Sequence, residues 1–125
     1  MDIDELSEHD LMILSLVEHL KEQEYKNIKA DLPDHEKPDG IPWGNNIPKH
    51  FPDVTARKNG TFHIFEVETV DSISEDHSHH QWLAFSEFTQ NTKSVFVLVV
   101  PKGYENIALD ILSEKNILAR IWGQD

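Results

Sequence analysis

The fold of this chain is decided by residues 51–69, FPDVTARKNGTFHIFEVET. Two β-prone runs in this stretch flank Asn59 and Gly60. Asn-Gly between such runs is the strongest short-range signal for a two-residue β-hairpin turn, because both turn positions need a positive φ. Counting outward from the turn pairs residues 58 to 53 with residues 61 to 66, in that order. The sequence therefore predicts an antiparallel hairpin with a fixed register.

Three acidic side chains are expected on one face of this hairpin. Because side chains alternate between the two faces of a strand, Glu66 and Glu68 project to the same side, and Asp53 faces Glu66 across the ladder. Like charges at this separation repel one another, and burial would raise at least one pKa. A hard cation such as Mg²⁺ would remove the conflict, since it prefers oxygen ligands. The alternative is that Glu66 and Glu68 form the solvated face of an amphipathic strand.

The arrangement of these acids resembles the signature of the PD-(D/E)XK nuclease superfamily, which has the restriction-endonuclease-like fold. Pro52-Asp53 precedes the hairpin turn, and Glu66-Val67-Glu68 follows it. The resemblance implies that Asp53 and Glu66 bind Mg²⁺ or Mn²⁺, and that the protein hydrolyses phosphodiester bonds in a nucleic acid, with DNA preferred over RNA. The third motif position is normally Lys, whereas this chain has Glu68, as some members do. That departure leaves the identity of the general base open.

The resemblance also implies roles for residues outside the metal-binding pair. Glu68 would orient or deprotonate the attacking water. Many members carry a Gln on the helix that follows the acidic strand, and Gln81 resembles it, so that Gln81 would orient the water or the scissile phosphate. Lys58 and His80 are the candidates for binding the substrate.

Length and composition indicate one domain of a soluble protein. At 125 residues the chain is long enough for one hydrophobic core but not for two. It has no run of eighteen apolar residues and no basic and apolar leader, so a cytoplasmic protein without membrane contact is expected. Because the chain has no cysteine, disulfides and thiolate metal sites are excluded.

The net charge of −12, from 11 basic and 23 acidic residues, argues against a free-standing DNA-binding domain. Lys and Arg supply most of the non-specific affinity for phosphate. Three explanations stay open: a basic patch near the site, a basic partner protein, or a substrate other than a long duplex. The charge and the missing motif Lys also motivate an alternative function, namely a catalytically silent member of the same fold that acts as an interaction or nucleic-acid-associated scaffold.

Hydrophobic periodicity predicts the other helices and strands. Ser7 fits a helix N-cap, and apolar residues at i, i+3, i+4 and i+7 predict a helix over about 8–23. Superfamily members often have an acid on this helix, but solvated charge is the preferred interpretation of Asp10 and Glu18. The other predicted elements are a strand within 25–32, a helix over about 79–90, a strand covered on both faces at 94–100, a helix ending near 115 and a strand at 118–122.

Two stretches carry other signals. Residues 33–52 contain five prolines and two glycines, which predicts a long loop, anchored to the core by Trp43. His77, His79 and His80 are clustered. Adjacent residues on one helix do not point together, and no carboxylate or Cys lies at ligand spacing, so a transition-metal site is the less favoured interpretation.

The order helix, strand, hairpin, helix, buried strand, helix, strand predicts an α/β sandwich with a mixed sheet. The same order matches the core of the superfamily. The resemblance therefore implies a single restriction-endonuclease-like domain over residues 1–125, in which helices flank a mixed central sheet in three layers. An ordinary α+β domain is the remaining alternative. Members of the superfamily often dimerise, and the apolar C-terminal strand offers an edge for a homodimer. The sequence does not decide the oligomeric state.

Overall fold

The computed structural model describes residues 6–42 and 49–125, which form an α/β protein with a five-stranded sheet. The strands lie in chain order, with β1–β2 and β2–β3 antiparallel and β3–β4 and β4–β5 parallel, so the sheet is mixed and open. No helix in the described part of the chain is long and apolar enough to cross a membrane. The elements are α1 (Glu8–Glu22), β1 (Lys26–Ala30), β2 (Val54–Lys58), β3 (Thr61–Val67), α2 (Asp76–Thr92), β4 (Val95–Pro101), α3 (Glu105–Lys115) and β5 (Arg120–Gln124).

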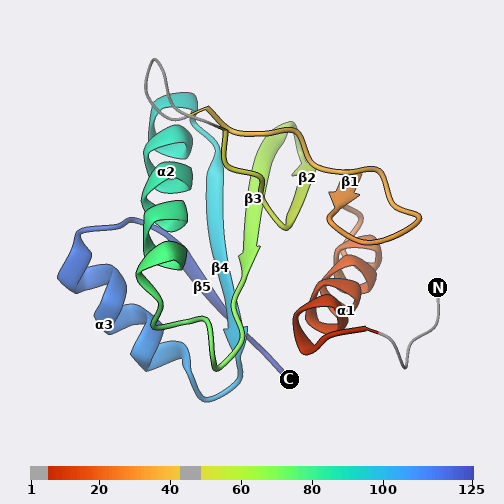
Figure 1. Ribbon diagram of the computed structural model, residues 1–125. Coiled ribbons are helices and arrows are strands. Elements are labelled where there is room, and N and C mark those ends of the chain that lie inside the picture. Colours follow the sequence, from red (N-terminus) through yellow and green to blue (C-terminus); the bar gives the residue numbers. More distant parts are fainter. Residues whose placement is uncertain (1–5, 43–48) are drawn as a thin grey trace.

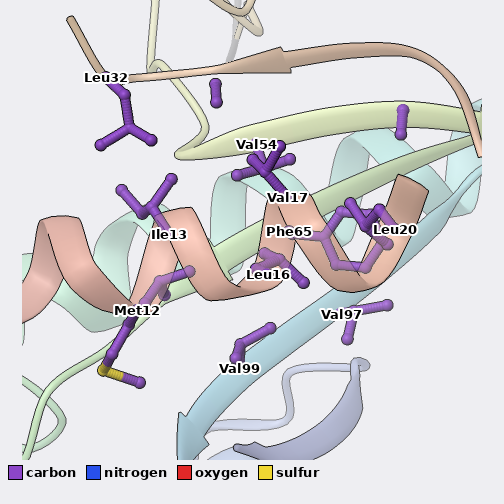
Figure 2. Close-up of a cluster of buried hydrophobic side chains, with 13 residues drawn as sticks. Met12, Ile13, Leu16, Val17, Leu20, Leu32, Val54, Phe65, Val97 and Val99 are labelled. Carbon is purple, nitrogen blue, oxygen red and sulfur yellow. The ribbon is translucent and has the colours of Figure 1, made fainter. Parts of the chain in front are cut away.

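The helices cover opposite faces of the sheet, which gives three layers (Figure 1). One core lies between α1 and the sheet, where Leu16 meets strand residues such as Phe65 (Figure 2). The second core lies between the opposite face and the helices α2 and α3, and includes Trp82, Leu98 and Ala108. Because successive strand residues point to opposite faces, the central strands feed both cores at once. The predicted α/β class with a mixed sheet and flanking helices is therefore confirmed.

The hairpin has the predicted turn and register. Asn59 and Gly60 have φ values of 52° and 80°, so both turn residues adopt the left-handed conformation. Lys58 pairs with Thr61, and the ladder continues without a bulge to the Val54–Phe65 pair. The turn chemistry alone was sufficient to set this register, because a two-residue turn leaves no freedom in how the strands align.

Replacing Gly60 with Ala is expected to lower the free energy of unfolding by about 1–2 kcal/mol, because a positive φ is unfavourable for a residue with a Cβ. An added Cβ at Gly60 meets no atom within 4 Å, so the cost is conformational and not steric. Urea denaturation measures it. The matched control is Asn59→Gly, which should remain close to wild type because Gly accepts the same φ. Equal stability of Gly60→Ala and wild type would contradict the turn geometry.

Three predicted elements differ in detail from the structure. The helix predicted from about 79 begins at Asp76, where a carboxylate in the first turn interacts favourably with the helix dipole. The last strand begins two residues later than predicted, because the chain leaves α3 through the left-handed Asn116 and Leu118 stays 66% exposed. The long loop after β1 is interrupted by a β-bridge between Ile41 and His50. Trp43 lies outside the described residues.

A candidate carboxylate site at the end of the hairpin

Three buried carboxylates lie where β2 begins and β3 ends. Asp53 immediately precedes β2, Glu66 is the last residue but one of β3, and Glu68 directly follows that strand. Their exposed fractions are 9%, 4% and 4%. The backbone N–H of Asp53 donates to Glu66 Oε1 at 3.1 Å, so the first two acids are adjacent as the hairpin register predicts. The interpretation of Glu66 and Glu68 as a solvated strand face is wrong, because both side chains are buried.

Asp53 connects three elements through one carboxylate oxygen. Its Oδ2 accepts a hydrogen bond from the Val67 backbone N–H at 2.8 Å and lies 3.2 Å from Nε2 of His9 on α1. The same Nε2 lies 3.1 Å from the Val67 carbonyl oxygen. Because both neighbours are acceptors, Nε2 of His9 is the donor. The hydrogen bond to Asp53 raises the pKa of His9 to about 9, against the opposing effect of burial. His9 is therefore protonated near neutral pH.

His9 is the residue of this site that the sequence interpretation missed. Of the two acids considered on the first helix, Asp10 donates its backbone N–H to the Ser7 cap and Glu18 pairs with Lys21 on the exposed side. Helix α1 thus contributes a positively charged histidine, His9, to the site instead of an acid. A signal for it was present, because His9 precedes Ile13 by four residues and so continues the buried stripe of the helix.

Titration of His9 followed by NMR is expected to give a pKa of about 9, which falls toward the ordinary value of 6.5 in Asp53→Asn. Since the folded-state pKa is raised, the stabilisation from this contact is complete below about pH 6.5 and is lost as the pH rises through about 9. The control Glu18→Gln removes an exposed acid from the same helix and should leave the titration of His9 in place. An unchanged His9 titration in Asp53→Asn would show that the contact is absent in solution.

Glu66 has the strongest electrostatic conflict in the site. Burial raises the pKa of Glu66 well above its ordinary value, and the charge of Asp53 and a hydrogen bond with its carboxylate raise it further. The Asp53 backbone N–H acts in the opposite direction but does not outweigh them. In the cation-free protein, burial and Asp53 therefore favour the protonated form of Glu66 more than water would.

Glu68 has one satisfied oxygen and one that is not. Ser72 Oγ donates to Oε1 at 3.3 Å, whereas Oε2 is buried without a hydrogen-bond partner among the described residues. Burial and the charge of Asp53 raise the pKa of Glu68 to about 7, although Ser78, Trp82 and Ser72 act to lower it. The indole N–H of Trp82 is likewise buried without a hydrogen-bond partner among the described residues. Neither Ser78 nor Trp82 therefore donates a hydrogen bond to Oε2 of Glu68. A buried acceptor left in this state costs about 1–3 kcal/mol.

The other predicted site residues make no hydrogen bond or ion pair with the three carboxylates in the described part of the chain. Gln81 is half-buried on α2 and His80 is exposed one residue before it, and neither makes a hydrogen bond to an acid within the described residues. Lys58 lies at the opposite end of β2 from Asp53, with its Nζ 5.0 Å from the centre of the Tyr25 ring. The structure thus brings the three acids together and leaves Lys58 about 16 Å along the strand.

Of the three clustered histidines, His79 is separated from His77 and His80, which both lie near His50. His79 is buried, with its Nε2 2.9 Å from the Ile73 carbonyl oxygen, whereas His77 and His80 are exposed. Across residues 6–42 and 49–125, no three His, Asp or Glu side chains are arranged at metal-binding distances.

These features define a class of protein: an α/β domain whose mixed five-stranded sheet carries a buried carboxylate cluster at the end of its hairpin. Comparisons of the chain with protein-family models, with curated proteins and with solved structures give no significant match. Its function is therefore inferred from the chemistry of the site itself.

Proposed function

We propose that this protein is a Mg²⁺- or Mn²⁺-dependent enzyme that hydrolyses phosphodiester bonds in a nucleic acid, preferably DNA, and that its fold is restriction-endonuclease-like. The observation that carries the proposal is the burial of Asp53, Glu66 and Glu68 beside one another. A mixed sheet in chain order, with α1 on one face and α2 on the other, supports the fold assignment. A cytoplasmic location remains an expectation from the sequence.

The residues fit a divalent cation on electrostatic grounds. Three acids share a site from which water is largely excluded, and a cation would offset their mutual repulsion. Oε2 of Glu68 is a buried acceptor without a partner in the described chain, as expected for an oxygen that awaits a cation or an ordered water. Asp53 and Glu66 would hold the cation with Glu66 deprotonated. Because no metal-binding group is preassembled among the described residues, this deprotonation is part of binding.

Each residue of the site would have a separate role in hydrolysis. A bound Mg²⁺ supplies polarisation of a phosphoryl oxygen and a lowered pKa for a coordinated water. Glu68 suits the role of general base, because its pKa of about 7 lies near the working pH. His9 holds Asp53 by its hydrogen bond and supplies a positive charge in a site that lacks the motif Lys. Gln81 and His80 would contact the substrate from α2.

The proposal is tested by hydrolysis of single-stranded, duplex and branched DNA in the presence of Mg²⁺ or Mn²⁺. Asp53→Ala is expected to reduce cleavage by roughly 100-fold or more, since the loss of an anchoring carboxylate weakens both cation binding and orientation. The control Asp110→Ala removes an exposed acid on α3 and should cleave like wild type. Equal cleavage by wild type and Asp53→Ala would assign the activity elsewhere.

The second candidate function is a catalytically silent scaffold of the same fold. It is favoured by Glu68 in place of Lys and by the lack of a preassembled metal-binding group among residues 6–42 and 49–125. Calorimetric titration with Mg²⁺ discriminates between the two. Heat of binding that disappears in Glu66→Ala supports the nuclease, provided that the wild-type heat also varies with the ionisation enthalpy of the buffer, which is the mark of proton release. Wild-type protein that binds no Mg²⁺ supports the scaffold.

Two partner proposals follow from the surface. The net charge of −12 favours a basic protein partner for any contact with a long duplex. Among the described residues β5 is an edge strand of the sheet, and its outer edge offers a site for pairing in a homodimer.

A further inference from the structure

We propose that the protein has a second nucleic-acid site, specific for a single strand, in a groove at the opposite end of the sheet from the three carboxylates. The groove has a volume of about 330 Å³. We call it the Tyr25 groove, after a lining residue that lies between α1 and β1. The residues of its wall that matter here are His19, Tyr25, Lys58, Arg120 and Trp122.

The groove exists because α1 ends before the sheet does. Val54 and Ala56 of β2 pack under α1, so Lys58 lies on the same face two residues further along. On β5, Trp122 packs against the same core, and Arg120 shares its face by the same alternation. The floor is the end of the apolar core, where Leu20, Phe65 and Val97 lie together (Figure 2).

The groove is electropositive in an acidic protein. No Asp or Glu of the described chain lines the groove or the adjoining cavity, also about 330 Å³, that shares Tyr25, Lys58 and Arg120 with it. Neither basic side chain forms an ion pair with a carboxylate in the described residues, in contrast with Lys29. Burial, together with the charges of Arg120 and Lys58, lowers the pKa of the neighbouring His63.

Aromatic rings lie between these charges. The Tyr25 ring lies 5.3 Å from that of His63 and 5.0 Å from Lys58 Nζ, and the His19 ring lies 4.5 Å from that of Trp122. Alternating cations and aromatic rings are the features that bind single strands, because phosphates pair with the cations and bases stack on the rings. A duplex keeps its base faces in its own stack, and a peptide made of Asp and Glu has no ring to stack. A single strand therefore matches both features.

The overall charge of −12 is compatible with this site. At 0.1 M salt, exposed charges more than about 10 Å apart are largely screened, so the local cations dominate the potential that a bound phosphate experiences. The acidic remainder of the surface would disfavour non-specific contact and direct a strand to the groove. The proposal does not depend on cation binding by the three acids, because Glu66 and Glu68 point to the opposite face of β3 from Phe65, which lies in the floor of the groove.

The test is the fluorescence anisotropy of a labelled oligothymidylate at low salt with EDTA, so that the carboxylate site plays no part. Lys58→Gln and Arg120→Gln are each expected to reduce the dependence of log K on log salt by about 0.7, and the double variant is expected to bind at least about tenfold more weakly. Tyr25→Leu should bind about tenfold more weakly with an unchanged salt dependence. The control Lys115→Gln removes an exposed charge from α3 and should bind like wild type.

Four results would overturn the proposal. The first is no binding of the oligothymidylate by wild type, and the second is equal weakening by Lys115→Gln. The third is displacement of the oligonucleotide by polyglutamate at equal charge concentration, which would assign the groove to an acidic protein. The fourth is self-association in sedimentation velocity that Lys58→Gln abolishes, which would make the groove an interface between copies. Circular dichroism and the thermal midpoint verify that each variant is folded; Lys58→Gln and Arg120→Gln alter polar groups at the groove and leave the apolar floor intact.

Discussion

Glu66→Gln is expected to reduce Mg²⁺-dependent hydrolysis of DNA by roughly 100-fold or more and, in the same preparation, to increase the stability of the cation-free protein. Gln has the shape of Glu and keeps an oxygen for the Asp53 backbone N–H, so the packing is retained. It removes a buried acid whose pKa is raised by burial and by Asp53. A group that weakens the fold while it enables binding of a cation is the signature of a functional residue.

The opposite changes in activity and in stability distinguish a functional role for Glu66 from a structural one. A purely structural role for Glu66 predicts that activity and stability fall together. Activity is measured as cleavage with Mg²⁺, and stability as the midpoint of urea unfolding in EDTA at pH 8. The control Glu18→Gln removes an exposed acid on α1 and should change neither quantity. A fall in stability of Glu66→Gln would refute the electrostatic account of the site.

Glu68→Gln is expected to stabilise the cation-free protein in a way that depends on pH. Because the folded-state pKa of Glu68 is raised from 4.5 to about 7, the folded protein retains a proton that the unfolded chain releases. Wild-type stability therefore falls as the pH rises from about 4.5 through 7, and Gln has no such loss. The variant should match wild type near pH 4 and exceed it by about 3 kcal/mol at pH 8.

Urea denaturation at several pH values between 4 and 8 measures this difference. The control Glu114→Gln alters an exposed acid at the end of α3, so the difference from wild type should stay constant with pH. A stability difference for Glu68→Gln that does not vary with pH would mean that the carboxyl titrates normally. Glu68 would then be a poor general base, and the base would have to be sought elsewhere in the site.

The parts of the site that could be predicted are those that follow from the hairpin turn and the alternation of side chains along its two strands. The requirement for positive φ at Asn59 and Gly60 set the turn, the turn set the register, and strand alternation then placed Glu66 and Asp53 beside each other. The sequence allows two alternatives for these acids, a buried cluster or a solvated strand face, and does not decide between them. A charged strand face carries the same pattern whether a helix covers it or water does.

By itself, the sequence determined the hairpin, the α/β order of the elements and the positions of the three acids along the chain, because each depends on local backbone preferences and on periods of two or 3.6 residues. Only the tertiary structure decided that His9 meets Asp53 across 44 residues of chain, and that Lys58 lines a groove far from the acids. Such contacts depend on where one element ends against another. The end of α1 over the sheet is a packing outcome that no local pattern records.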